Sequence, residues 1–251
     1  MITTLGEMLD DSWGYAKGGV WGKGKNWLLL IISLIIFPLI LGYSVWIYRG
    51  EKPAPELQHW GTMFIDGLKL LVVSLIYAVP IILLVIVAFL PFVSALITSG
   101  AITADFASMT SEQTNLWITS HPEILSAALF MAGLLLITAI VAIVITIFSF
   151  LGIVRFARTG RIREGFNFSE ILSRISRIGW LNYLAALIVI GIIGIIFWVL
   201  LHVFALIPVI GEAIFVIVAL ILYPPFILFV TRFASLVYER GEPVAAASTS
   251  Q

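Results

Sequence analysis

The apolar positions of this chain gather into five long stretches separated by short polar connections. A helix needs about 20 apolar residues to cross a bilayer core of about 30 Å, and each stretch reaches that length. The pattern predicts an all-α fold, a polytopic helical membrane protein with about five transmembrane helices and short amphipathic helices at the cytoplasmic interface. The stretches lie near residues 27–48, 68–98, 124–154, 181–206 and 210–238.

The first stretch, residues 27–48, leaves two interpretations open. It either crosses the membrane or forms a re-entrant hairpin that bends at Pro38. Its length favours a crossing. Charge favours the hairpin, because a crossing with the C-terminus inside would leave Lys17, Lys23 and Lys25 on the outer side. The side on which the N-terminus lies depends on this choice.

Lysine and arginine collect in alternate connections. The connection from residue 155 to 180 carries six arginines, and the one from 49 to 67 carries Arg49 and Lys52, whereas residues 99–123 carry neither lysine nor arginine. These are the charges that resist translocation. We therefore expect a multi-pass protein of the cell membrane, with the arginine-rich connection and the C-terminus in the cytoplasm.

The arginine-rich connection has the pattern of an amphipathic helix. Asn167 stands as an N-cap with Glu170 three residues on, and the apolar positions that follow recur at helical spacing. One interpretation lays this helix in the headgroup plane, where its cations meet anionic lipid phosphates. The other packs it against the protein's own cytoplasmic face. The expected lipid contacts are Arg161, Arg163, Arg174 and Arg177.

The chain divides into three parts by this pattern. Residues 1–26 form an N-terminal amphipathic segment whose polar side is acidic, which indicates docking onto the protein or a partner rather than onto anionic lipid. Residues 27–242 form one helical membrane domain. Residues 243–251, rich in Ala, Ser and Thr, form a tail that we expect to be disordered.

Composition narrows the class of protein. Hydrophobic residues make up 61% of the chain and charged residues 11%, with a mean hydropathy of +1.12, which no ordinary soluble domain shows. The formal net charge is zero, so no overall field favours nucleic acid. The absence of cysteine excludes disulfides and thiolate chemistry.

Polar groups inside the apolar stretches offer one weak candidate for chemistry. His202 lies within the fourth stretch and Glu212 begins the fifth, so a tight turn at Pro208 would bring them together as a pH-sensitive pair. Alternatively, Glu212 complements a helix N-terminus and His202 bonds a backbone carbonyl. The histidines form no metal-site pattern, and no catalytic or cofactor motif is present, so we expect no enzyme and no cofactor.

Two glycines of the fourth stretch, Gly191 and Gly194, are expected to permit close packing of helices, because small residues let transmembrane helices approach one another. Pro208 and Gly211 predict a turn so tight that the fourth and fifth helices form an antiparallel hairpin.

Several short motifs resemble a known family. Trp60, Phe64, Asp66-Gly67-Leu68-Lys69, Pro80, Arg158, Gly160-Arg161 and Phe166-Asn167-Phe168 are similar to positions in a group of uncharacterised prokaryotic, mostly archaeal, multi-pass membrane proteins catalogued as a domain of unknown function. The resemblance implies a helical fold in the cell membrane. It implies no activity and no catalytic residue.

Everything specific in the chain concerns spans, interfaces and headgroup-level charge. We therefore expect a nonenzymatic structural, lipid-organising or accessory component, with membrane lipids as partners and a membrane-protein partner or a homo-oligomer as further expectations; nucleic acid is not expected. The alternative is a transporter or channel for a small solute, for which the proline-interrupted helices give slight support.

Overall fold

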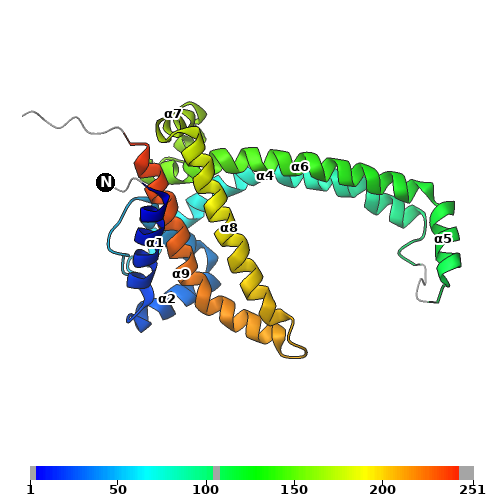
Figure 1. The fold of residues 1–251 in the computed structure, drawn as a ribbon, viewed down its shortest axis with the longest axis horizontal. Helices are drawn as coiled ribbons and strands as arrows, with labels where there is room; N and C mark the ends of the chain where they lie inside the picture. Colours follow the sequence, from blue (N-terminus) through cyan, green and yellow to red (C-terminus); the bar gives the residue numbers. More distant parts are fainter. Residues whose placement is uncertain (1–3, 104–107, 243–251) are drawn as a thin grey trace, which may run out of the picture. The chain divides into compact units, whose positions relative to one another are not determined.

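The computed structural model describes residues 4–103 and 108–242, and the tail predicted to be disordered lies outside them. Every regular element among the described residues is a helix, and these residues contain no strand. Figure 1 shows the arrangement of the helices within each part of the chain. The elements are α1 (Leu5–Val20), α2 (Gly24–Ile35), α3 (Phe37–Tyr48), α4 (Trp60–Thr98), α5 (Ser111–Ser120), α6 (Pro122–Thr159), the 3-10 helix η1 (Ile162–Phe166), α7 (Phe168–Ile178), α8 (Trp180–Ala205) and α9 (Gly211–Arg240).

Four of the described helices, α4, α6, α8 and α9, are long and apolar enough to cross a membrane. The all-α membrane fold predicted from the apolar stretches is confirmed.

The first stretch differs from a single crossing helix, because it forms the two 12-residue helices α2 and α3. Ile36, with φ −96° and ψ 76°, interrupts them. Pro38 has no N–H to donate to the carbonyl of Leu34 four residues earlier, and proline suits the first turn of a helix, so α3 starts afresh and the chain bends beside the position where the hairpin interpretation placed the bend.

The helices group into two compact units. One contains residues 75–146, which include the distal parts of α4 and α6 and the whole of α5. Pro80 and Pro91 lie inside α4, which continues through both as one helix. The buried positions of this unit include Tyr77, Ala88, Ala95 and Thr138. The other unit contains the remaining described residues and every candidate site residue.

Helices α8 and α9 form the predicted antiparallel hairpin (Figure 1). The turn brings backbone against backbone, because a Cβ added to Gly211 would come within 2.7 Å of the carbonyl oxygen of Phe204. Val209 occupies the left-handed region at φ 69°. The hydroxyl of Tyr183 donates to the carbonyl oxygen of Ile147 at 2.5 Å, which ties the start of α8 to α6.

A close crossing joins α3 to the beginning of α4. A Cβ on Gly67 would overlap the carbonyl oxygen of Pro38, and a Cβ on Gly42 would overlap that of Met63. Only glycine allows backbones to approach this closely. The glycines expected to have this role were chosen wrongly: a Cβ on Gly191 or Gly194 meets no atom of the described chain within 4 Å.

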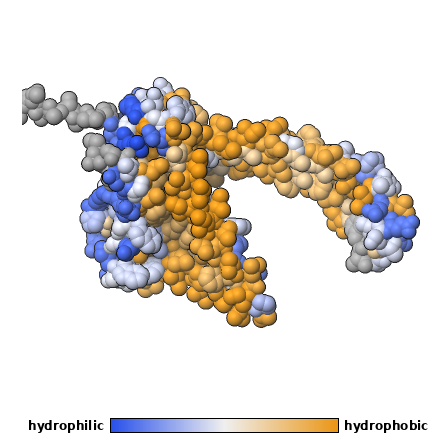
Figure 2. Space-filling model, viewed as in Figure 1, coloured by the Kyte–Doolittle hydropathy of each residue, from blue (hydrophilic) through white to orange (hydrophobic). Residues whose placement is uncertain are grey.

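In the unit that contains α1 and α9, the hydrophobic core lies along the C-terminal half of α9. Helix α1 packs against this half of α9. Met8 near the start of α1 packs in one cluster with Tyr238 near the end of α9, while Tyr15 and Val20 pack in a second cluster with Leu228. The two helices are therefore antiparallel. Figure 2 shows hydrophobic residues covering the α8–α9 hairpin and hydrophilic residues gathered over α1 and around α7.

A tryptophan repairs the hydrogen-bond gap that proline leaves in α9. Pro224 and Pro225 lie inside the helix, and a proline has no N–H to donate to the carbonyl four residues earlier. For Pro225 that carbonyl belongs to Ile221. The indole Nε1 of Trp27 donates to the Ile221 oxygen at 3.0 Å, so α2 supplies the missing donor.

The variant Trp27→Phe is expected to lower the free energy of unfolding by about 1–3 kcal/mol, because the Ile221 carbonyl would lose its donor on a helix surface that faces hydrocarbon rather than water. Thermal unfolding in detergent measures the change. Trp21→Phe is the matched control, since Trp21 is 75% exposed and has no side-chain hydrogen bond within the described chain. Equal effects of the two substitutions would contradict the role of the indole N–H.

Candidate functional site

An ion pair fastens α1 to α9. Arg232 is only 1% exposed, and its Nε donates to Asp11 Oδ1 at 2.7 Å. Lys52 Nζ donates to the other carboxylate oxygen of Asp11, also at 2.7 Å. Burial opposes ionisation of the Asp11 carboxyl, but the hydrogen bonds from Arg232 and Lys52 outweigh it and hold its pKa below the ordinary value. The acidic face of the N-terminal segment thus docks onto the protein itself.

The C-terminal ends of α3 and α6 are joined by reciprocal hydrogen bonds from two arginines. Arg49, just after α3, donates to the carbonyl oxygen of Ala157 at 3.1 Å, and Arg158 in the last turn of α6 donates to the carbonyl oxygen of Tyr48 at 2.5 Å. The last carbonyls of a helix have no partner within the helix, so each arginine satisfies an acceptor of the other. Gly50 follows at φ 92°, in the left-handed region that favours glycine. A Cβ added to Gly50 would lie 3.2 Å from Nη2 of Arg158.

The same arginine reaches α9. Nη2 of Arg158 donates to Glu239 Oε1 at 2.6 Å and to Ser235 Oγ at 2.9 Å. Arg49 also pairs with Asp66 at 2.8 Å. The two basic connections predicted to share one side of the membrane therefore meet each other and the C-terminal end of α9.

The amphipathic helix predicted in the arginine-rich connection is α7. The side chain of Asn167 accepts from the backbone N–H of Glu170, as the capping pattern predicted. Ile171, Ile175 and Ile178 are buried against the protein. The apolar face of α7 therefore packs in the protein core rather than facing away from it.

Glu164 in η1, the short helix before α7, accepts hydrogen bonds from Arg155. Arg155 donates to Glu164 through both Nε and Nη2. The hydrogen bond from Arg155 lowers the pKa of the Glu164 carboxyl below its ordinary value. This pair fixes η1 to the end of α6.

Two of the four arginines expected to contact lipid bind the end of α9. The guanidinium of Arg174 lies 4.1 Å from the ring centroid of Tyr238 and donates to its hydroxyl at 3.2 Å. Arg177 donates to the carbonyl oxygen of Gly241 at 2.9 Å and to Ser173 Oγ at 2.8 Å. These contacts occupy donors that the other interpretation assigned to lipid phosphates, and lipid contact by Arg174 and Arg177 stays a prediction.

The other two arginines, Arg161 and Arg163, are exposed, and their side chains make no hydrogen bond or ion pair to the described residues. They line an open hollow of about 620 Å³ together with Glu164, Phe166, Asn167 and Phe168. This hollow combines two exposed guanidinium groups with aromatic side chains and with the carboxylate of Glu164, which Arg155 already binds. Its chemistry suits the phosphate of a lipid headgroup.

The structure brings His202 into contact with aromatic residues and does not pair it with Glu212. Nδ1 of His202 lies 2.8 Å from the carbonyl oxygen of Trp198, and the imidazole lies 3.9 Å from the Trp198 ring system and 5.0 Å from the Phe215 ring. Glu212 is exposed in the first turn of α9. The described residues contain no ion pair between the two side chains, and a pH-sensitive pair stays a prediction.

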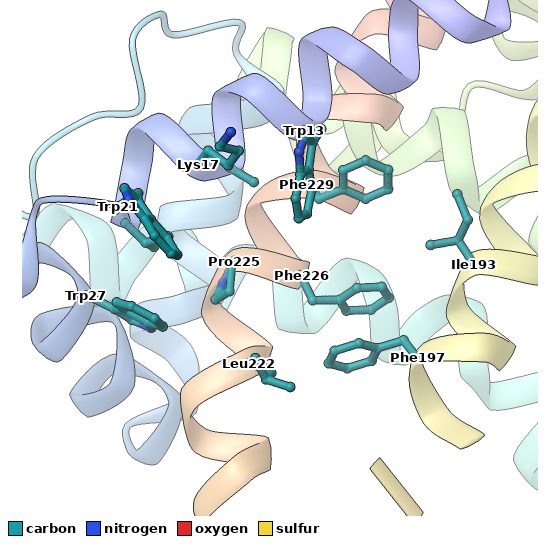
Figure 3. A pocket seen from close by; sticks show the side chains of 12 residues that line it. Trp13, Lys17, Trp21, Trp27, Ile193, Phe197, Leu222, Pro225, Phe226 and Phe229 are labelled. Atoms are coloured by element: carbon teal, nitrogen blue, oxygen red, sulfur yellow. The ribbon is translucent and has the colours of Figure 1, made fainter. Parts of the chain in front are cut away.

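An aromatic groove, which the sequence did not indicate, lies between α1, the start of α2, α8 and α9. Its volume is about 810 Å³, and Lys17 is the one charged residue that lines it. Figure 3 shows Trp13 and Lys17 projecting from α1, Trp27 from α2, and phenylalanines from α8 and α9. Its lining is Trp13, Ala16, Lys17, Val20, Trp21, Trp27, Ile193, Phe197, Leu222, Pro225, Phe226 and Phe229.

The groove was missed because its residues come from four segments far apart in the sequence. The sequence places Trp13 on the apolar side of the N-terminal segment. Only the structure shows that this side chain is 60% exposed in the folded chain. A large apolar side chain left uncovered on a packed helix marks a contact surface. Within the described residues, no group of three or more His, Cys, Asp or Glu side chains could hold a metal ion.

Comparison with known proteins gives a family and no activity. No curated protein and no solved structure matches the chain. Residues 27–206 match the sequence model of a family described as a protein of unknown function, DUF4013. The motifs that carried the resemblance all lie inside this range, while the match carries no indication of an archaeal source. Because the match extends over well more than half of the chain, the protein belongs to the DUF4013 family.

Proposed function

We propose that the protein is a nonenzymatic membrane component that gathers anionic phospholipid at its arginine-rich face. The single observation that carries this proposal is the pair of exposed guanidinium groups of Arg161 and Arg163, which form no hydrogen bond with the described residues, beside an open hollow. The neighbouring arginines Arg155, Arg158 and Arg174 bind carboxylates or Tyr238 of the protein. Exposed cations at headgroup level attract anionic lipid by about 1 kcal/mol each.

The proposed orientation places this face in the cytoplasm of a cell whose plasma membrane α4, α6, α8 and α9 cross. The path of the first stretch supports it. Helix α2 passes Ile221 and reaches the hollow beside Phe215, and α3 returns so that the Tyr48 carbonyl meets Ser235. A re-entrant path of this kind keeps α1 on the same side as the end of α9. The lysines of the N-terminal segment then no longer oppose the charge rule.

Lipid selectivity in proteoliposomes tests the proposal. We expect spin-labelled phosphatidylglycerol to associate with the wild-type protein more strongly than spin-labelled phosphatidylcholine. The double variant Arg161→Gln/Arg163→Gln is expected to reduce the preference at this hollow by about thirtyfold, because each of the two cations contributes about 1 kcal/mol. Raising the salt concentration to about 1 M should weaken the wild-type preference, since the Debye length falls to about 3 Å.

The matched control is Lys23→Gln/Lys25→Gln, which removes two exposed charges from a different segment. It should leave most of the preference intact. An unchanged preference in the arginine variant would overturn the proposal. Solute flux through the reconstituted protein would instead favour the transporter or channel.

A further inference from the structure

We infer that the aromatic groove holds one acyl chain of an anionic phospholipid, with the lipid's phosphate beside Lys17. This site is distinct from the hollow at Arg161 and Arg163, and the inference does not rest on that hollow. The groove is lined wholly by residues of one compact unit. Its volume of about 810 Å³ falls in the range of sites that enclose small ligands, about 300–1,000 Å³.

The two ends of the groove differ in polarity in the same way as the two ends of a lipid. Lys17 and Trp21 come from α1 and the turn that follows it. The opposite end is made by Phe197 of α8 and Phe226 of α9, whose rings stack with centroids 3.9 Å apart. Figure 3 shows the Phe197 and Phe226 rings facing each other, with Lys17 on α1 at some remove from them.

Apolar surface alone does not select an occupant within a membrane, because lipid tails are as apolar as the groove. Two other effects do. An empty groove leaves its lining atoms without dispersion contacts, so a flexible chain that fills it is favoured. The single charge in the lining then decides the headgroup, since an ammonium attracts phosphate and repels a cationic head. A phospholipid with net negative charge meets both conditions.

The tryptophans fit the same occupant. Trp13 and Trp21 are 60% and 75% exposed, although α1 is otherwise docked on α9. Indole rings favour the boundary between headgroups and acyl chains, where an apolar ring and a polar N–H are both satisfied. Their exposure beside Lys17 marks the mouth of the groove as this boundary.

Native mass spectrometry of the full-length protein in detergent tests the inference, with added phosphatidylglycerol and phosphatidylcholine as probes. We expect the Arg161→Gln/Arg163→Gln chain, which lacks the other proposed lipid site, to retain one phosphatidylglycerol in preference to phosphatidylcholine, and the groove variants are made in this background. Ile193→Trp places a larger ring in the groove and should weaken retention of both lipids about tenfold. Lys17→Gln should spare retention of phosphatidylcholine and reduce the preference for phosphatidylglycerol by about fivefold.

Two controls keep the result specific. Ile192→Trp adds the same ring one residue away on α8, at a side chain that is 50% exposed and outside the groove. Arg161→Gln/Arg163→Gln removes the other lipid site and should leave this single bound lipid in place. Unchanged retention by Ile193→Trp, or an equal loss in Ile192→Trp, would overturn the site. An unaltered headgroup preference in Lys17→Gln would overturn the assigned role of Lys17.

Discussion

The variant Asp11→Asn is expected to lower the free energy of unfolding by about 3 kcal/mol. It leaves the guanidinium of Arg232, which is 1% exposed, without its principal anion. Removing one partner of a buried ion pair costs about 3–5 kcal/mol, because the remaining charge stays buried. We place the effect at the lower end of that range, since Glu239 remains 3.8 Å from Arg232 Nη1. Unfolding in detergent, followed by tryptophan fluorescence, measures the loss.

Asp10→Asn is the matched control, because it removes the neighbouring and exposed carboxylate. Its effect should stay within about 0.5 kcal/mol. A second control starts from Arg232→Met, in which the buried charge is gone and Asp11→Asn should cost little more. Similar losses in Asp10→Asn and Asp11→Asn would show that the ion pair does not fasten α1 to α9.

The same pair sets a pH dependence. The pKa of the Asp11 carboxyl is lowered in the folded protein, so its contribution to stability is present above the unfolded pKa of about 3.9. That contribution is lost as pH falls through the folded pKa. The difference in stability between the wild type and Asp11→Asn should therefore be constant from about pH 5 to 8 and shrink below about pH 4.

The second large effect is expected for Gly67→Ala, which should destabilise the protein by about 2–3 kcal/mol. The added Cβ would overlap the carbonyl oxygen of Pro38 and lie 2.8 Å from the backbone nitrogen of Gly42. Backbone atoms cannot change rotamer, so the two helices must move apart. Alanine also favours a helix by about 1 kcal/mol over glycine, and this gain offsets only part of the cost.

Gly191→Ala is its control, because a Cβ there meets open space within the described chain. The helix preference of alanine then acts alone, and the variant should be as stable as the wild type or slightly more so. Thermal unfolding of both variants under one detergent condition gives the comparison. Equal stability of the two variants would contradict a close crossing at Gly67.

Hydrophobic periodicity predicted the helices well where local rules decide the outcome. The apolar run after residue 180 became α8, and the Asn167 cap opened α7 as its spacing required. The bend near Pro38 could also be predicted from the sequence, because proline interrupts the helical hydrogen bonds of its own segment. In each case the cause lies within a few residues of its effect.

Contacts between distant segments were not readable in the same way. Gly191 and Gly194 looked like packing positions, yet the contact surface is at Gly42 and Gly67, which stand in two different helices. A glycine in an apolar run shows that a backbone can be approached but does not show which helix approaches it. The arginines pose the same problem, because Arg174 binds Tyr238, 64 residues away.

The same distinction between local and long-range causes holds for the candidate site residues. Charge patterning identified the arginine-rich connection, and the exposed Arg161 and Arg163 lie within it. It could not separate these two from Arg174 and Arg177, whose donors are directed to α9. The aromatic groove escaped altogether, since Lys17 and Phe197 are brought together only by folding.

The pairing of α1 with α9 bears on how the polypeptide is made. Asp11 and Arg232 are 221 positions apart, so α1 can form this ion pair only after the ribosome has synthesised the chain as far as α9. Until then, the apolar side of α1, with Met8 and Tyr15, has no α9 to cover it. A nascent chain arrested at the end of the family match, residue 206, would therefore hold an α1 that is not yet docked on α9.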